Sequence, residues 1–414
     1  MGEPPAARSG LKGWVDRLRP HERVFAISIS TALVMTGQGM AGPVLPVFAR
    51  EFGVSLAAVG LTVSAFGLAR LLLNVPLGSF ADRHGRRSLL IGGPLVLAVS
   101  MIGAGLSGGI VSLGLWRFVS GAGSAMYMTG ALVYLTDVST PANRGRLIGA
   151  NQGALLFGQA IGPGLGGLIA DQFGIRAPFF VIAGAGLLAA LYGMLRLEET
   201  RPERTPHTDQ AAPGARSRWR EILGSRVFLA VALVNFAIFF TRSSSNNTMM
   251  PLKGVGDFGL SLAEMGLIMT GIALTNLALL PVAATLSDRR GRIKAIAPSL
   301  LGMAIALLVI GASVDVSWFV VGAGILAVST AMSGPAPAAF AADHAREDIR
   351  GLSLGIFRTA GDLGLLVGPP LLGLIADVGG FGAAFGVNAV IVAVAAGVFY
   401  TTTRVRPVAG ESAR

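Results

Sequence analysis

Long apolar runs alternate with short polar segments along the whole chain. Twelve runs are long enough to cross a membrane as helices, at about residues 24–48, 56–78, 88–107, 110–136, 147–170, 177–196, 227–251, 262–286, 294–313, 317–341, 352–376 and 382–402. About 20 apolar residues in a helix span about 30 Å of hydrocarbon, and in lipid only helices or closed barrels satisfy the backbone. Because the runs are continuous and lack the alternation of barrel strands, they predict an all-α membrane protein with twelve transmembrane helices.

The polar segment between the second and third runs has a second copy 206 residues later. Residues 78–87 read GSFADRHGRR, and residues 284–292 read ATLSDRRGR. The same offset aligns Asp137 with Asp343 and places two copies of the sequence GLIAD in register. A repeat of this length in an apolar chain is typical of transporters built from two parallel six-helix units. We therefore predict two pseudo-symmetric six-helix bundles.

Lysine and arginine are distributed unevenly among the polar segments. The tails and even-numbered loops hold 26 of the 33 residues, the odd-numbered loops hold three, and four lie inside spans. Because positive residues favour the cytoplasmic side, both termini and the even-numbered loops are predicted to be cytoplasmic. The resulting divisions are a tail (1–22), a bundle (23–196), a charged linker (197–226), a second bundle (227–402) and a tail (403–414).

Composition excludes several classes of function. The chain is 52% hydrophobic and 13% charged, whereas soluble domains have about 25% charged residues. The net charge of +11 reflects topology rather than nucleic-acid binding. There is no cysteine, which excludes disulfides and thiolate metal sites. The sequence has no nucleophile–base pair, phosphate-binding loop or metal-ligand cluster, so we predict a protein of the lipid bilayer that is not an enzyme and needs no cofactor or metal.

Three motifs resemble those of the major facilitator superfamily. The loop at 78–87 matches G-x-x-x-D-R-x-G-R-R, the fourth span carries R-x-x-x-G-x-G from Arg117, and the fifth carries G-x-x-x-G-P-x-x-G-G from Gly158. The fifth-span motif is similar to that of the family's proton-coupled drug exporters. The resemblance covers all twelve spans and implies a transporter whose spans 1, 4, 7 and 10 line a central cavity.

The loop motif is predicted to form a cytoplasmic gate. Its residues in both copies, with the acid that they are expected to reach, are Gly78, Asp82, Arg83, Gly85, Arg86, Arg87, Asp137, Asp288, Arg289, Gly291 and Arg292. Glycine supplies the turn angles and aspartate can cap a helix. By resemblance, Asp82 faces the start of span 11, and Arg83 or Arg86 reaches Asp137, which latches the bundles together. In the alternative interpretation, these arginines only fix the topology.

The fifth-span motif predicts close helix packing. Its residues are Gly158, Gly162, Pro163, Gly166 and Gly167. Glycines four residues apart present a smooth face to a neighbouring helix, and proline removes a hydrogen-bond donor and bends the span. Packing alone and a direct part in antiport both remain open.

Asp362 is the one acidic residue that falls well inside a span. Ionisable residues at this depth are functional candidates by default. Arg358 lies four residues earlier on the same helical face. We predict that the two residues take part in proton coupling, and the alternative is a permanent ion pair that helps the helix to insert. Gln152 occupies the position of Arg358 in the first bundle.

Polar residues near the middle of other spans predict the wall of a substrate cavity. Arg117 is expected to bind substrate or assist proton release, or else to bond neighbouring carbonyls, whereas Arg70 is expected to pack near the cytoplasmic end. The cavity candidates are Gln38, Arg117, Ser124, Met128, Gln152, Arg242, Ser244 and Asn247. Four arginines against one aspartate inside spans favour an anionic or zwitterionic cargo. The family's drug exporters often carry an acid in the first span, where this chain has Gln38.

We therefore predict a secondary active transporter of the cell membrane that works by alternating access. The first hypothesis is proton-coupled efflux, by antiport, of a small organic compound or drug, by a protein that acts as a monomer. A proton symporter that imports a small organic anion is the alternative, and a non-transporting membrane sensor on the same fold is a further one.

Overall fold

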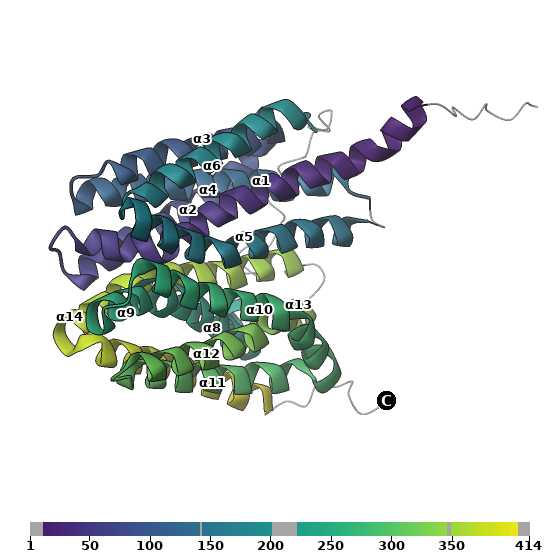
Figure 1. Ribbon diagram of the computed structural model, residues 1–414. Coiled ribbons are helices and arrows are strands. Elements are labelled where there is room, and N and C mark those ends of the chain that lie inside the picture. Colours follow the sequence, from purple (N-terminus) through teal and green to yellow (C-terminus); the bar gives the residue numbers. More distant parts are fainter. Residues whose placement is uncertain (1–10, 141–142, 201–221, 346–348, 405–414) are drawn as a thin grey trace, which may run out of the picture.

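The computed structural model describes residues 11–140, 143–200, 222–345 and 349–404 (Figure 1). The first group of helices, here the N half, is α1 (Leu11–Arg50), α2 (Leu56–His84), α3 (Arg86–Gly105), α4 (Ile110–Val138), α5 (Arg144–Phe173) and α6 (Ala177–Arg196). The second group, the C half, is α8 (Arg226–Thr241), η1 (Arg242–Met249), α9 (Met250–Phe258), α10 (Leu262–Arg290), α11 (Arg292–Ala312), α12 (Val316–Ser333), α13 (Ala336–His344) and α14 (Arg350–Arg404). The described chain contains no strand, which confirms the predicted all-α fold.

The described helices include 11 that are long and apolar enough to cross a membrane. The last runs over 52 residues, from Leu352 to Thr403. At about 1.5 Å per residue this is about 78 Å, enough for two crossings. Gly380 interrupts the helix with a φ of 75°, so α14 supplies both the eleventh and the twelfth predicted spans.

Some boundaries differ from the predicted ones. Helix α1 begins at Leu11, inside the predicted N-terminal tail, and the seventh span continues through η1 and α9 to Phe258. The tenth span is broken after Ser333, where Gly334 and Pro335 separate α12 from α13. Most of the predicted linker and C-terminal tail lies outside the described residues.

The two glycines at the end of the repeated loop have the same backbone conformation. Gly85 ends α2 and Gly291 ends α10, each with a φ of 89°. This left-handed region favours glycine because a Cβ would be strained there. The repeat therefore preserves a turn that joins two long helices at the same place in each half.

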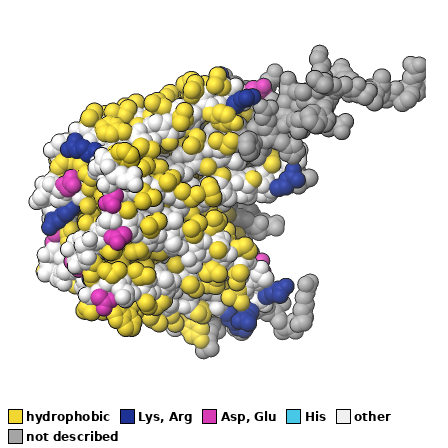
Figure 2. Space-filling model, in the orientation of Figure 1, with side chains coloured by type: hydrophobic (Ala, Val, Ile, Leu, Met, Phe, Trp, Pro, Cys, Tyr) yellow, Lys and Arg dark blue, Asp and Glu magenta, His cyan; other side chains and the backbone are white. Residues whose placement is uncertain are grey.

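The halves touch at one end of the molecule and part at the other. The closed end carries the connections at 51–55, 106–109, 174–176, 259–261 and 313–315, and the open end carries the turns at Gly85 and Gly291. The N half lies above the C half in Figure 1, with α2 packed against α14 and α5 against α10. Figure 2 shows the hollow between them on the right, at the open end.

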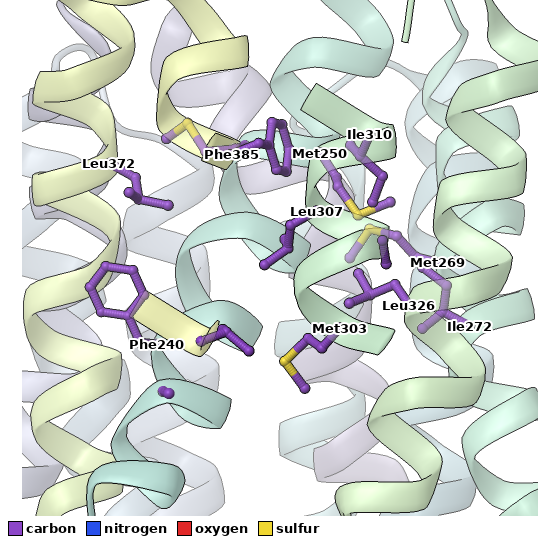
Figure 3. Close-up of a cluster of buried hydrophobic side chains, with 14 of the residues drawn as sticks. Phe240, Met250, Met269, Ile272, Met303, Leu307, Ile310, Leu326, Leu372 and Phe385 are labelled. Atoms are coloured by element: carbon purple, nitrogen blue, oxygen red, sulfur yellow. The ribbon is translucent and has the colours of Figure 1, made fainter. Parts of the chain in front are cut away.

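The apolar core follows the same division. One core cluster fills the C half and continues into the closed end of the N half, where it includes Phe48 and Phe179. A separate cluster, with Tyr127 and Tyr134, fills the open end of the N half. Figure 3 shows the C-half part, in which methionines such as Met303 adapt to the spaces where helices meet.

Four glycines bring the halves into backbone contact at the closed end. A Cβ on Gly60 would lie 2.3 Å from the Pro369 oxygen, and one on Gly266 would lie 2.4 Å from the Pro163 oxygen. A Cβ on Gly373 or Gly167 would be as close to a backbone oxygen at the start of α2 or α10, respectively. These glycines form two pairs that the 206-residue repeat relates, so both contacts between halves follow one pattern.

Asp377 adds a charged contact across the closed end. Its Oδ1 and Oδ2 accept hydrogen bonds of 2.8 and 2.9 Å from the backbone N–H groups of Leu56 and Ala57, at the start of α2. The N-terminus of a helix favours a carboxylate because its N–H groups lack helical partners. In the repeat-related position, Asp171 is exposed and has no such bond with described residues. There, the start of α10 is capped by its own Ser261 and Glu264.

We expect Asp377→Ala to open the closed end about fivefold more often. Hydrogen bonds to charged groups contribute about 1.5–3 kcal/mol, and solvent exposure of Asp377 lowers this to about 1 kcal/mol. The distance between spin labels on Glu51→Cys and Val314→Cys measures the opening, and the chain has no other cysteine. Asp171→Ala is the matched control and should change nothing. Equal effects of the two variants would contradict the role of Asp377.

Candidate functional site

The register between α2 and α14 places a charged pair between the halves. The two helices run antiparallel, with Gly67 against Leu365 and the Ser64 hydroxyl donating to the Leu366 carbonyl. One turn further toward the open end, the same register places Arg70 opposite Asp362. These residues are about 20 Å from the closed-end start of α2 and about 18 Å from the start of α14, near the middle of the helices.

Asp362 is half-buried and its carboxylate has no direct partner among the described residues. It forms no hydrogen bond, and no Lys, Arg or His nitrogen lies within 4.0 Å of it. The positive charges that act on it through space belong to Arg70 and Arg358. The predicted neighbour Arg358 is thus near Asp362, but the structure does not join them in an ion pair.

Arg70 is the residue whose position the sequence analysis missed. Its guanidinium makes no hydrogen bond or ion pair with a described residue, and its Nε is buried without a partner. The ring of Phe66 lies 5.9 Å from the guanidinium carbon, at the outer limit of a cation–π contact. The sequence predicts only a packing role for it, because sequence alone does not give the register of α2 against α14.

Arg242 joins this site from the C half. Its Nη2 donates a 2.6 Å hydrogen bond to Oε1 of Gln159 on α5, in the N half. The side chain is exposed although it belongs to the middle of a span, so it borders the space between the halves. Its charge and that of Arg70 repel each other. We call Arg70, Arg242 and Asp362 the central cluster.

The polar run after Arg242 forms η1, a π-helix from Arg242 to Met249. Such segments are rare and occur often at functional sites. Within it, Ser244 is fully buried and donates to the Phe240 carbonyl over 2.6 Å, so it does not border the cavity in this conformation. Asn388 holds η1 in place by donating to Ser245 over 2.6 Å. Asn247 accepts a hydrogen bond from its neighbour on the same segment.

A second cavity lies inside the N half, between α1, α2, α3, α4 and α6. Gln38 and Arg117 line it, and Gln38 donates a 2.9 Å hydrogen bond to Ser124. The Arg117 guanidinium lies 4.8 Å from the ring centre of Phe66. Phe66 therefore contacts Arg117 as well as Arg70, and the predicted candidates fall into two groups on either side of this ring.

Two other predicted cavity residues do not line this pocket inside the N half. Met128 packs against the open-end core of the N half, and Gln152 is exposed on α5. Among the described residues, no group of three or more His, Asp or Glu could hold a metal ion.

The residues of the fifth-span motif pack against two different helices. Gly158, Gly162 and Gly166 lie against the backbone of α1, where a Cβ would come within 2.4 to 2.6 Å of a carbonyl oxygen. Gly167 and Pro163 face α10 in the other half. The motif thus packs the N half internally and also forms part of its contact with the C half.

The described part of the gate motif makes contacts within its own half. Arg86 Nε lies 2.8 Å from Asp137 Oδ2, and Arg292 pairs with Asp343 in the repeat-related position. Asp288 lies 3.4 Å from Arg292. The backbone N–H groups of Arg86 and Arg87 donate to Glu199, which the sequence analysis did not select. Arg83 and Arg289 are exposed, and the contacts of Gly78 and Asp82 lie outside the described part of the structure.

Known proteins share both the sequence pattern and the fold. The profile of the Major Facilitator Superfamily matches residues 27–254 and 233–414. An uncharacterized MFS-type transporter of Methanocaldococcus jannaschii is 23% identical over 360 residues, which cover 86% of this chain and 92% of that protein. Multidrug resistance protein 1 of Bacillus subtilis is 29% identical over 242 residues, 58% of this chain and 61% of that protein.

A solved structure gives the same result for the fold. A bacterial homolog of the human lysosomal transporter Spinster, in an inward-facing and occupied conformation, superimposes with a TM-score of 0.77 at 17% identity. The match covers 97% of this chain and 98% of that one. The chain therefore belongs to the Major Facilitator Superfamily and is a multi-pass membrane transporter of small molecules rather than an enzyme.

Proposed function

We propose that this transporter exports small organic compounds in exchange for protons. The observation that carries the proposal is Asp362, a half-buried acid without a direct partner at the interface between the halves. The sequence similarity to a multidrug resistance protein supports export as the direction. One chain supplies both sides of this interface, so a monomer in the cell membrane is sufficient.

The closed end and the open end of the molecule support a mechanism of alternating access. With the positive residues on the cytoplasmic side, the open end faces the cytoplasm, where an exporter takes up its cargo. Parting of the glycine contacts at the closed end would then expose the same site to the outside. A proton that binds Asp362 there would displace the cargo and return with the protein to the cytoplasmic side.

A second candidate is a symporter that imports an organic anion with a proton. The observation in its favour is the excess of positive charge, since the described spans hold Arg70, Arg117, Arg242 and Arg358 away from their ends, against Asp362. An anion near Asp362 would favour its protonated form, so anion and proton would bind together. In the proposed export, by contrast, the cargo and the proton compete for the site, so binding of one releases the other.

Flux in inside-out membrane vesicles separates the two functions. We expect that a panel of fluorescent cationic, zwitterionic and anionic compounds will include members that enter the vesicles when the lumen is acidified, with release of luminal protons. Vesicles without the protein are the control. Uptake of organic anions into right-side-out vesicles, driven by protons, would support the symporter instead. No flux in either orientation would favour a sensor.

A further inference from the structure

The central cluster contains charged groups whose hydrogen-bonding capacity is not used. Arg70 and Asp362 make no hydrogen bond or ion pair with described residues, and the hydrogen bond that Arg242 makes with a described residue goes to the neutral Gln159. Arg70 and Asp362 are partly buried, and charged groups that are removed from bulk water are costly unless they are paired and hydrogen-bonded. The cluster is therefore arranged for partners that come from outside the chain.

The signs and positions of these charges define the partner. Arg70 belongs to the N half and Arg242 to the C half, and their mutual repulsion decreases when an anion lies between them. Asp362 lies opposite Arg70 in the helix register, yet more than 4.0 Å separates it from any cationic nitrogen of the described residues. The site therefore has two donors for an anion and, beside them, one acceptor for a cation.

We propose that the cargo is a zwitterion whose carboxylate is held by Arg70 and Arg242 and whose ammonium group is held by Asp362. The proposal rests on the proposed function in one respect, that the cargo binds between the halves. Guanidinium groups match carboxylates through paired N–H donors. Because the two arginines come from opposite halves, the bound carboxylate joins both moving parts of the protein.

The arrangement predicts whether cargo and proton exclude each other or bind together. A proton and the ammonium group compete for Asp362, so a zwitterion is exchanged for a proton. A carboxylic acid without an ammonium group does not compete with the proton for Asp362. Protonation of Asp362 instead favours its binding, because it removes the negative charge beside the bound carboxylate. The other charges that act on Asp362 are Arg70 on α2 and Arg358 on its own helix, and Arg242 on η1 acts on Arg70. All three are cationic, so Asp362 is the one acid of the site.

Three naphthalene compounds test the proposal on the purified full-length protein in detergent. They are 6-(aminomethyl)-2-naphthoate, 2-naphthoate and 2-naphthylmethylamine, which carry both charges, the carboxylate alone and the ammonium alone. We expect the zwitterion to bind at least about tenfold more tightly than either relative in calorimetric titration. Lowering the pH through the titration of Asp362 should weaken binding of the amine and strengthen binding of the acid.

Variants of the charged residues test which of them binds the carboxylate of the cargo and which binds its ammonium group. Arg70→Gln and Arg242→Gln should each weaken binding of the zwitterion and the acid about tenfold and leave the amine no weaker. Asp362→Asn should weaken the zwitterion and the amine but not the acid. Arg290→Gln, an exposed arginine at the end of α10, removes the same charge and should change nothing. Arg70→Lys keeps the charge but loses the paired N–H donors, so it should bind the zwitterion more tightly than Arg70→Gln and less tightly than the unaltered protein, which separates loss of the site from loss of folding.

Tightest binding by the amine, or equal binding by the acid and the zwitterion, would overturn the proposal. Unchanged binding in both Arg→Gln variants would do the same. The titration uses no membrane and no proton gradient, so it does not depend on the direction of transport. A protein that binds the zwitterion but does not exchange it for protons would refute the proposed export alone.

Discussion

Replacing Asp362 by asparagine is expected to reduce proton-coupled flux at least about 100-fold. Asparagine keeps the shape of the side chain but cannot bind and release a proton, and Asp377, another described acid at the interface between the halves, lies at the closed end rather than near the middle of the helices. The effect corresponds to about 3 kcal/mol or more of lost coupling, as expected when one charged group is the whole proton site. A pH-sensitive dye inside proteoliposomes measures substrate-driven proton movement.

The control for this change is Asp171→Asn. Asp171 is exposed at the closed end and bonds no described residue, so the variant should keep its proton flux. Equilibrium binding of the cargo should survive in Asp362→Asn at a reduced level, because the arginines remain. If substrate-driven proton movement persists in Asp362→Asn, Asp362 is not the coupling residue and the ion-pair interpretation gains support.

Gly60→Ala is expected to shift the protein toward opening at the closed end by about tenfold or more. The added Cβ would lie 2.3 Å from the Pro369 oxygen and 2.6 Å from the Pro370 nitrogen, both in the backbone of the other half. Overpacking of this kind costs about 1–3 kcal/mol, and parting of the halves relieves it. The spin-label distance between positions 51 and 314 should lengthen.

Gly271→Ala is a closely matched control. It is also a helical glycine, in α10, but a Cβ there would meet no atom within 4 Å. Both variants gain about 1 kcal/mol of helix propensity, so only the contact differs between them. We expect the melting temperature to rise in Gly271→Ala. The spin-label distance should change only in Gly60→Ala. Equal distances in the two variants would show that Gly60 does not limit the approach of the halves.

The fold could be predicted because membrane physics leaves few choices. Apolar length gave the spans, and the 206-residue repeat gave two equivalent halves. The details that failed were local. The seventh span continues through α9 to Phe258, beyond its predicted end, and the polar run after Arg242 adopts a π-helix instead of an α-helix. Neither follows from hydrophobic periodicity, which gives the apolar length of a span but not its local backbone geometry.

The candidate site could be predicted only in part because its geometry depends on pairing between helices. Asp362, Arg242 and Arg117 were selected as charges inside spans, and the structure places two of them at the interface between the halves. Only a packing role is predicted for Arg70, because the acid that it faces lies 292 residues away on α14 and no local sequence pattern relates the two. Ser244 was selected for its polarity, but its hydroxyl is satisfied by the Phe240 carbonyl four residues earlier. A local hydrogen bond of this kind is common for serine in helices.

Asp377 bonds the other half of the molecule, whereas Asp171 does not. The two contacts between the halves at the closed end, here the α2–α14 seam and the α5–α10 seam, therefore respond differently to salt. The α2–α14 seam includes an exposed carboxylate bonded to a helix terminus, and mobile ions screen such a contact. The α5–α10 seam has a neutral hydrogen bond from Gly164 to Thr270, which salt hardly affects. At high ionic strength the α2–α14 seam loosens first, and the α5–α10 seam then becomes the hinge about which the molecule swings.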